Sequence, residues 1–366
     1  MTDEEYMRTA IQLAQKGCGW VNPNPMVGAV IVKDGKIIGQ GFHRKFGGPH
    51  AERNALSDCV SSPLGAALYV TLEPCCHYGK TPPCTEAILD SGIRRVVIGS
   101  SDPNPLICGK GTEILRSRGI EVTEGVLKDE CDSLNKSFFH YIRTKTPYVM
   151  MKYAMTMDGK IATRTGKSQW ITGEAARRRV HEDRHRYSAI MAGIGTVLVD
   201  DPLLTCRLEN GRNPIRIVCD TNLRTPLSSR LVSTAKLFGT ILATSAEEHE
   251  RHLPYLEAGC KIVVVPEKDG HIDLNCLMAK LGEMEIDSIL LEGGGTLNWS
   301  ALQSGIVNKV QTYIAPKLFG GNGKTPVAGI GADRPDEAFQ LSKPSITLIG
   351  EDILLESEVI TCSQEL

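Results

Sequence analysis

The amino-acid sequence predicts an α/β protein of two domains. At 366 residues the chain is longer than one ordinary domain of roughly 150 residues. Segments with the patterns of strands and helices alternate along it, and the alternation starts again after Pro147. Such alternation implies largely parallel sheets with helices on both faces.

In the first half, a helix and a hairpin precede the alternating segments. Apolar residues recur at helical spacing from Tyr6 to Lys16, and strand-like residues flank a turn at Asp34-Gly35. The alternation continues with helix AERNALSD, strand AALYVTLEPC, helix TEAILDSG, strand RRVVIGSSD and helix GKGTEILRSRG.

The domain boundary is predicted between Thr144 and Pro147, which gives domains 1–146 and 147–366. The second domain contains strand candidates and a polar helix, in IRIVCD, KLFGTILATS, KIVVVP, SILLEGGG and EAARRRVHEDRHRYS. Because no repeat of fixed period relates the two halves, we expect two different folds joined end to end.

The composition excludes several classes of protein. A net charge of -2 gives no basic excess for nucleic acid, so none is expected as a partner. The acidic N-terminus lacks the features of a signal peptide, and no run approaches the roughly 18 apolar residues of a membrane span. We therefore expect a cytoplasmic protein without a membrane partner, whose 12 cysteines are reduced thiols, some of them available for a metal site.

The stretches HAERNA and EPCCHYGKTPPC contain the residues of a zinc site. His50 precedes a helix, Cys75 ends a strand, and Cys84 begins a helix after two prolines. Three protein ligands leave a fourth zinc position open for a water, which zinc makes more acidic. Glu52 would then carry protons beside the metal, as in the H-x-E and P-C pattern of zinc nucleobase deaminases.

The cysteine spacing of this motif leaves an alternative open. Eight residues separate Cys75 from Cys84, where that pattern has two. A structural zinc site closed by Cys76 or His77 as fourth ligand is the other interpretation. The presence of Glu52 favours catalysis.

The segments HAE, TLEPCCHYGKTPPC and SDPNPLICGKG together resemble the bacterial bifunctional riboflavin-biosynthesis deaminase-reductase family, and the resemblance extends nearly end to end. It implies a cytidine-deaminase-like three-layer domain followed by a dihydrofolate-reductase-like domain. It also accounts for the longer cysteine spacing. Position 76 is commonly serine in that family and is Cys76 here, so Cys75 is expected to be the ligand.

The resemblance implies the substrate and its contacts in the first domain. The expected substrate is a pyrimidinone with a ribosylamino 5′-phosphate, whose exocyclic amine is replaced by oxygen. The matching substrate positions are Asn24, His43, His77, Lys80, Asp102 and Asn104. The asparagines offer paired donors and acceptors, and Lys80 and the histidines could meet the phosphate. Asn24 could instead belong only to a turn, and His43 could be a loop histidine.

In the second half, SILLEGGGTLNWSAL combines a strand, three glycines and a helix. The helix N-terminus could receive a phosphate, although a tight turn without ligand would have a similar sequence. Composition alone cannot show that a hydride is transferred here. The resemblance implies an NADPH-dependent reduction of the ribosyl chain to ribityl.

The matching reductase positions fall into two groups. Substrate contacts are expected from Lys152, Ser168, Arg184, Leu204, Arg207 and Glu292. Cofactor contacts are expected from Ala154, Trp170, Thr172, Thr196, Asp200, Gly294, Gly295 and Thr296. Arginines suit a sugar phosphate because the guanidinium binds it with two hydrogen bonds. Arg184 could instead be a solvated charge on a surface helix, and only Lys152 and Glu292 are candidates for proton donor.

Two other functions stay open. One is a nucleoside or tRNA deaminase with an unrelated appended nucleotide-binding domain, and the other is a zinc-stabilised nucleotide-binding module without activity. Members of the family are commonly assemblies, so a homo-oligomer is expected.

Overall fold

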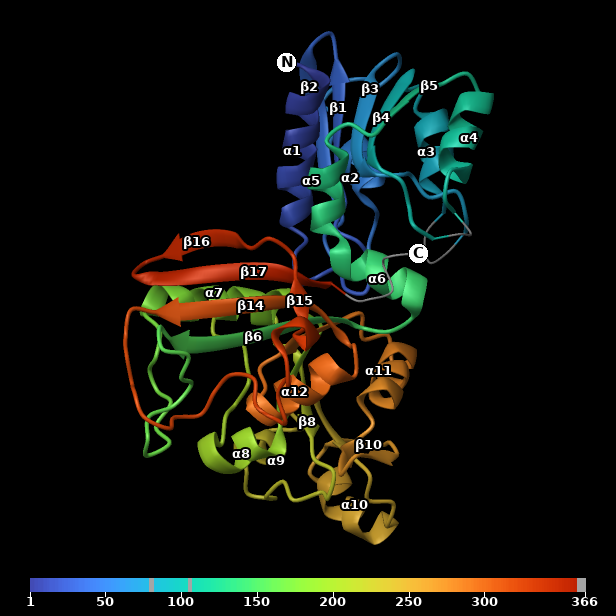
Figure 1. The fold of residues 1–366 in the computed structure, drawn as a ribbon. Helices are drawn as coiled ribbons and strands as arrows, with labels where there is room; N and C mark the ends of the chain where they lie inside the picture. Colours follow the sequence, from blue (N-terminus) through green and yellow to red (C-terminus); the bar gives the residue numbers. More distant parts are fainter. Residues whose placement is uncertain (79–81, 105–106, 361–366) are drawn as a thin grey trace. The chain divides into compact units, whose positions relative to one another are not determined.

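A computed structural model describes residues 1–78, 82–104 and 107–360 of the chain. It divides into two compact units, Met1–Lys145 and Thr146–Leu366, and each has its own sheet (Figure 1). No described helix is both long and apolar enough to span a bilayer.

The N-terminal unit has three layers, with a five-stranded sheet in the middle. The strand order is β2-β1-β3-β4-β5, in which β1 pairs antiparallel with β2 and β3, and β3, β4 and β5 are parallel. The strands are β1 (Gly28–Lys33), β2 (Lys36–Phe42), β3 (Ala67–Leu72), β4 (Arg95–Ser100) and β5 (Glu121–Glu124). The hairpin predicted at Asp34-Gly35 is confirmed.

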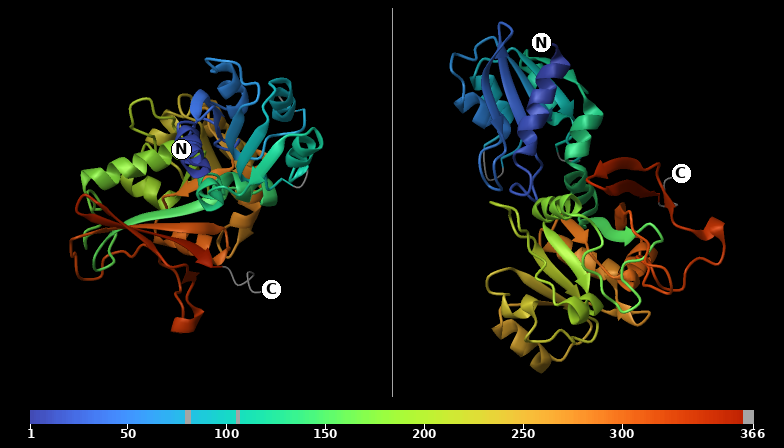
Figure 2. Two further views of the ribbon diagram at one scale, coloured as in Figure 1. Left: turned by 90° about the horizontal axis from the view of Figure 1, so that it is seen from above. Right: turned by 90° about the vertical axis from the view of Figure 1, so that its left-hand side faces the viewer.

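Alternating strand residues bury opposite faces of this sheet. Val30, Val32 and Val97 pack with α1 and α5, whereas Ile31, Leu68 and their neighbours pack with α2, α3 and α4. The helices are α1 (Asp3–Gln15), α2 (Ala51–Ser57), α3 (Cys84–Asp90), α4 (Lys110–Ser117), α5 (Lys128–Leu134) and α6 (Lys136–Thr144). The sheet and its two helical layers can be followed in two further views (Figure 2).

The C-terminal unit has a ten-stranded sheet in the order β10-β9-β8-β7-β13-β6-β14-β17-β15, with β16 also paired to β17. The pairs from β10 to β14 are parallel, and those of β17 are antiparallel. The strands are β6 (Tyr148–Thr156), β7 (Ala189–Gly193), β8 (Ile215–Cys219), β9 (Thr240–Thr244), β10 (Lys261–Val264), β13 (Ser288–Leu291), β14 (Val307–Ala315), β15 (Gln340–Leu341), β16 (Ser345–Ile349) and β17 (Asp352–Ile360). The largely parallel sheet is confirmed, whereas the antiparallel strands at its end were not predicted.

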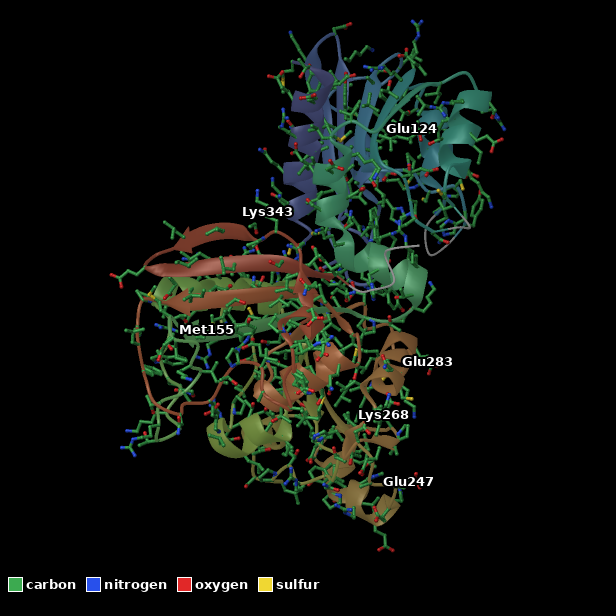
Figure 3. The ribbon with its side chains drawn as sticks, viewed as in Figure 1. Glu124, Met155, Glu247, Lys268, Glu283 and Lys343 are labelled. Atoms are coloured by element: carbon green, nitrogen blue, oxygen red, sulfur yellow. The ribbon has the colours of Figure 1, made fainter. Side chains whose placement is uncertain are left out.

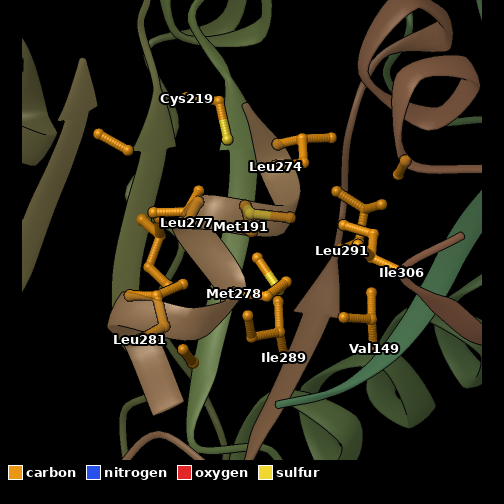
Figure 4. Close-up of a cluster of buried hydrophobic side chains, with 14 of the residues drawn as sticks. Val149, Met191, Cys219, Leu274, Leu277, Met278, Leu281, Ile289, Leu291 and Ile306 are labelled. Atoms are coloured by element: carbon orange, nitrogen blue, oxygen red, sulfur yellow. The ribbon is translucent and has the colours of Figure 1, made fainter. Parts of the chain in front are cut away.

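Helices cover both faces of this sheet. Met191, Ile289 and other inward residues pack with α11 and α12 on one face (Figure 4), and Ile190, Val218 and Leu242 pack with α8, α9 and α10 on the other. The helices are α7 (Glu174–Arg186), α8 (Ile194–Asp200), α9 (Arg230–Ser233), α10 (His249–Glu257), α11 (Leu274–Glu283) and α12 (Gly295–Gln303). Strands β11 (Glu267–Lys268) and β12 (His271–Ile272) form a separate hairpin, and η1 (Pro335–Glu337) is a 3-10 turn.

Charged side chains remain on the outside of this unit. Glu247, Lys268 and Glu283 are exposed around α10, the small hairpin and α11 (Figure 3).

Candidate functional site

Three predicted metal ligands meet in the N-terminal unit. His50 caps α2, Cys75 follows β3, and Cys84 begins α3. The Nδ1 atom of His50 lies 3.5 Å from Sγ of Cys75 and 3.4 Å from Sγ of Cys84. Zinc bonds of about 2.3 Å to sulfur and about 2.0 Å to nitrogen at tetrahedral angles would separate such atoms by about 3.5 Å. The geometry therefore fits a zinc ion.

Hydrogen bonds to Cys75 favour its thiolate form. The thiol of Cys84 and the ring of His50 both lie within hydrogen-bonding distance of Sγ of Cys75. The backbone N–H of Cys84 also donates to this sulfur over 3.3 Å. These contacts lower the pKa of Cys75 below its usual value, first through Cys84 and then through His50. A thiolate is the form that binds a metal.

Glu52, in the first turn of α2, lies next to the metal ligands without joining the ligand group. Its side chain is buried, and burial together with the charge of Cys75 raises the pKa of the carboxyl to about 7. Within the described residues the ligand group consists of His50, Cys75 and Cys84. Cys76 and the exposed His77 lie outside this group, so the described geometry does not provide the fourth ligand of a closed structural site.

Asn24 and His43 form a chain of contacts that ends at His50. The Nδ2 atom of Asn24 lies 3.3 Å from Nε2 of His43, and Nδ1 of His43 lies 3.1 Å from the Pro49 carbonyl. Since a carbonyl only accepts, Nδ1 of His43 carries the proton and Nε2 accepts from the amide. The His43 and His50 rings are 5.4 Å apart, edge to face. Asn24 and His43 are therefore neighbours of the metal group.

A buried glutamate that the sequence analysis missed organises the rest of this site. Oε2 of Glu73 accepts from the N–H groups of Asp102 and Gly109, and Oε1 accepts from those of Gly111 and Thr112. One carboxylate thus joins the end of β3 to the loop after β4 and to the first turn of α4. Its position immediately before Pro74 and Cys75, at the end of an apolar strand, was the available signal.

Of the other predicted substrate residues, the structure describes His77, Asp102 and Asn104. Asp102 is buried, which raises the pKa of its carboxyl, and its Oδ1 accepts from the N–H of Asn104 over 2.8 Å. The charge of His77 lowers the pKa of Asp102 and so opposes the effect of burial. These three residues therefore lie in one region, whereas Lys80 is outside the described residues.

In the C-terminal unit, predicted substrate residues form an ionic cluster. Arg184 on α7 donates two hydrogen bonds to Glu292, with Nε 2.7 Å from Oε1 and Nη2 3.0 Å from Oε2. Nζ of Lys152 on β6 lies 3.6 Å from Oε2 of Glu292. Arg184 is only 14% exposed, so the interpretation of Arg184 as a solvated surface charge is wrong.

The charges of this cluster fix the protonation of Glu292. Burial alone would raise the pKa of the carboxyl, but the charges of Arg184 and Lys152 outweigh burial and hold it at about 2. Glu292 is therefore ionised at neutral pH and is no source of protons, which leaves Lys152 as the remaining one of the two candidates.

His181 belongs to the same region and was not predicted. Its Nδ1 accepts from the backbone N–H of Arg207 over 3.3 Å. Burial and then the charges of Arg184 and Arg207 lower the pKa of His181 to about 4, so it is neutral. The side chain of Arg207 itself is exposed. Lys152, Arg184 and Arg207 against Glu292 leave this cluster with two positive charges, which suits a phosphate dianion.

A cavity of about 770 Å³ lies at the carboxyl ends of β7, β8 and β13. This volume is typical of a site for a small molecule or cofactor, and the position is where parallel sheets bind ligands. The predicted residues that line it are Ser168, Thr196, Asp200, Gly294, Gly295 and Thr296.

The glycine turn before α12 is needed for close packing as well as for access. A Cβ at Gly295 would lie 2.7 Å from the carbonyl oxygen of Thr325, and one at Gly293 would lie 2.7 Å from Oδ1 of Asn298. The N-terminus of α12 thereby opens into the cavity with its unpaired N–H groups available for a phosphate.

The remaining predicted residues do not line the cavity. Trp170 is exposed and stacks with the guanidinium of Arg177 at 4.9 Å, and the carbonyl of Thr172 accepts from the same guanidinium. Ala154 faces Tyr313 of β14. The side chain of Leu204 is buried in the core beneath α8 and α9, so only its backbone is available to a ligand.

Two protein-family models match the chain. The model described as RibD C-terminal domain matches residues 147–355. The model described as cytidine and deoxycytidylate deaminase zinc-binding region matches residues 1–100. The first lies within the C-terminal unit and the second within the N-terminal unit, and they include the ionic cluster and the three metal ligands.

Full-length relatives and solved structures are also similar. The riboflavin biosynthesis protein RibD of Actinobacillus pleuropneumoniae is 57% identical, with coverage of 99% of this chain and 96% of the relative. The riboflavin biosynthesis protein RibD of Escherichia coli K12 is 40% identical, with coverage of 97% of this chain and 99% of the relative.

Among structures, RibD of Acinetobacter baumannii has a TM-score of 0.88 at 34% identity and covers 98% of this chain and 99% of its own. A diaminohydroxyphosphoribosylaminopyrimidine deaminase/5-amino-6-(5-phosphoribosylamino)uracil reductase of Thermotoga maritima has a TM-score of 0.85 at 40% identity, with the same coverage of both chains.

Proposed function

The chain belongs to the RibD family of bifunctional riboflavin-biosynthesis deaminase-reductases, and we propose that its two units carry out the two reactions on one phosphorylated pyrimidine. The first is hydrolysis of 2,5-diamino-6-ribosylamino-4(3H)-pyrimidinone 5′-phosphate to 5-amino-6-(5-phosphoribosylamino)uracil and ammonia. The second is reduction of the ribosyl chain to ribityl by NADPH. The observation that carries the proposal is the ligand group of His50, Cys75 and Cys84 with a buried carboxyl beside it.

In the deaminase, zinc would be held by these three residues and would supply a Lewis acid that lets water act as a nucleophile near neutral pH. Glu52 takes a proton from that water, gives a proton to the ring nitrogen, and helps the amine to leave as ammonia. A carboxyl with a pKa of about 7 can both accept and donate protons at neutral pH, which supports this role.

Substrate orientation is assigned to the residues around the metal group. Asn24 and His43 would face the pyrimidine, because they lie in contact with each other and next to His50. Asp102 and Asn104 would meet it from the loop that Glu73 holds. His77 and Lys80 are proposed to meet the phosphate.

In the reductase, NADPH would occupy the cavity beside Thr196, Asp200 and the turn at Gly294, and it would supply the hydride. Ala154, Trp170 and Thr172 do not line the cavity, and we place them next to the cofactor at its margin. Ser168 and the backbone of Leu204 would complete the substrate side. The chain's own part is orientation, because Arg184 and Arg207 can hold the phosphate while Glu292 fixes Lys152 and Arg184.

Removal of the metal tests the deaminase assignment. Protein stripped with a chelator and dialysed is expected to stop releasing ammonia from the diamino-pyrimidinone and to recover on addition of zinc. It should still oxidise NADPH when given the deaminated substrate. Unchanged ammonia release by protein shown to be metal-free would contradict the zinc site.

We also propose that like chains assemble. Ile346 and Leu348 on β16 are 68% and 74% exposed, and β16 pairs only with β17 among the described strands. Such apolar side chains on an edge strand are typical of a contact surface. Light scattering after size exclusion should show an oligomer that Leu348→Lys weakens, and a monomeric wild-type protein would contradict the proposal.

A further inference from the structure

The order of strands indicates which end of the reductase cavity holds which end of the cofactor. This step rests on the proposed reductase function. Lys152 lies on β6 and Glu292 directly follows β13, so the nicotinamide must lie near these strands for hydride transfer. The cavity continues past β7 to the end of β8, about 10 Å from β13 at two strand spacings. The adenosine end of a bound cofactor would therefore lie beyond β8.

The turn after β8 at that end is held firmly. Oδ2 of the fully buried Asp220 accepts from both the N–H and the hydroxyl of Thr225, at 2.7 Å each. The hydroxyl of Tyr255 donates to the carbonyl of Thr225 over 2.7 Å. The turn also contacts the small hairpin, since the N–H of Ile272 donates to Oγ1 of Thr221. The residues between 221 and 225 thus have a fixed backbone.

Two cationic side chains, Arg224 and Lys324, line the cavity, and they lie at different places. The carbonyl of Lys324 accepts from the N–H of Ile161, which places Lys324 beside the segment that follows β6. Arg224 lies on the fixed turn after β8, with His271 on the same part of the wall. Its guanidinium has no ion pair or hydrogen bond within the part of the chain that the structure describes.

We propose that Arg224 binds the 2′-phosphate of the NADPH adenosine and thereby makes the reductase select NADPH over NADH. The two dinucleotides differ only in this phosphate. A guanidinium without an internal partner can donate two parallel hydrogen bonds to a phosphate. The fixed turn presents it with little loss of backbone freedom on binding. The ring of His271 supplies a further nitrogen at the same end of the cavity.

Binding measurements on the full-length protein test this directly. Dissociation constants for NADPH, NADH, 2′,5′-ADP and 5′-AMP are determined by isothermal titration for the wild type, Arg224→Ala and Arg224→Lys. Arg224→Ala is expected to weaken NADPH and 2′,5′-ADP by about 10- to 100-fold and to leave NADH and 5′-AMP unchanged. Arg224→Lys should lie between, because lysine keeps the charge and loses the planar pair of donors.

Lys324→Ala is the matched control, since it removes the other lining cation at the opposite end. It should change NADPH and NADH affinities by the same factor. An equal loss of NADPH and NADH in Arg224→Ala, or unchanged affinity for both, would overturn the inference while leaving the reductase assignment intact. A wild-type protein that binds neither dinucleotide would overturn the proposed reductase and the inference with it. Melting temperatures of all variants show whether each is folded.

Discussion

At the scale of single residues, two buried carboxyls have opposite protonation because their neighbours differ. Glu52 lies among thiols, so burial and the charge of Cys75 raise its pKa to about 7. Glu292 is largely buried, with 13% of its side chain exposed, but it touches Arg184 and Lys152, whose charges outweigh burial and lower its pKa to about 2. Environments that give two carboxyls very different pKa values are typical of residues with different chemical roles. Glu52 is suited to transfer protons and Glu292 to remain a fixed anion.

Glu52→Gln is predicted to lower deamination by at least about 100-fold, because an amide cannot transfer the proton. Zinc content should stay the same, since the three ligand atoms belong to other residues. The measurement is ammonia release together with metal analysis. Deamination within a few-fold of wild type would remove Glu52 from the mechanism.

Glu73→Gln tests the carboxylate that holds the loop of Asp102 and the start of α4. The variant amide offers one oxygen to four N–H donors and places its own donor among them. We expect a loss of about 2 kcal/mol in unfolding free energy and a higher KM for the diamino-pyrimidinone. Glu113→Gln on the exposed face of α4 is the control and should change neither. Equal denaturation midpoints for both variants would refute this role.

Asp183→Asn tests a buried acid on α7. Burial raises the pKa of Asp183 to about 6 from 3.8, so the folded protein binds this proton more tightly than the unfolded chain. The contribution of Asp183 to wild-type stability should therefore decrease as pH rises from about 4 through 6, by about 2 to 3 kcal/mol in total. The asparagine variant lacks this loss, so its gain in melting temperature over wild type should be larger at pH 8 than at pH 5. A gain of the same size at both pH values would contradict the assigned pKa.

At the scale of elements, α7 shows why charge patterns can mislead. Its sequence is so rich in arginine and histidine that solvated charges were one expectation. The helix nevertheless buries Ala176 and Val180 against Tyr313 and Leu354, and it places Arg184 against Glu292. The ion pair thereby fastens α7 to the end of β13.

Arg184→Ala is predicted to cost about 3 to 5 kcal/mol in the C-terminal unit, because Glu292 would keep only Lys152 at 3.6 Å as a charged partner. NADPH oxidation should fall sharply and ammonia release should not. Arg178→Ala, whose side chain is 77% exposed on the same helix, should leave both unchanged. A melting transition and a reductase rate equal to those of Arg178→Ala would exclude an essential ion pair.

The elements with a clear local pattern were predictable, and those set by distant partners were not. The hairpin at Asp34-Gly35 and the strands around Val218 and Leu290 follow from turn chemistry and apolar runs. The strands β14, β16 and β17 were not predicted, because polar residues interrupt their apolar runs. Their pairing also depends on residues far apart in the sequence, up to 159 positions as between Ala315 and Thr156. Similarly, the metal ligands stand in a recognisable motif, whereas the role of Glu73 and the position of His181 depend on tertiary contacts.

At the scale of the whole molecule, each unit has its own sheet, its own core and its own cluster of functional residues. The two reactions should therefore be separable by mutation. The product of the deamination is the substrate of the reduction, which gives a chemical reason for joining the two units in one chain.

The central claim is that one chain performs deamination and then reduction, and a single coupled assay tests it most directly. Purified zinc-loaded protein is mixed with the diamino-pyrimidinone phosphate, ammonia is followed first without NADPH, and NADPH oxidation is followed after its addition. We predict ammonia release without NADPH, and then oxidation of one NADPH for each ammonia released. Ammonia release without any later oxidation of NADPH would contradict the account of the C-terminal unit, and no ammonia release would contradict the account of the metal site.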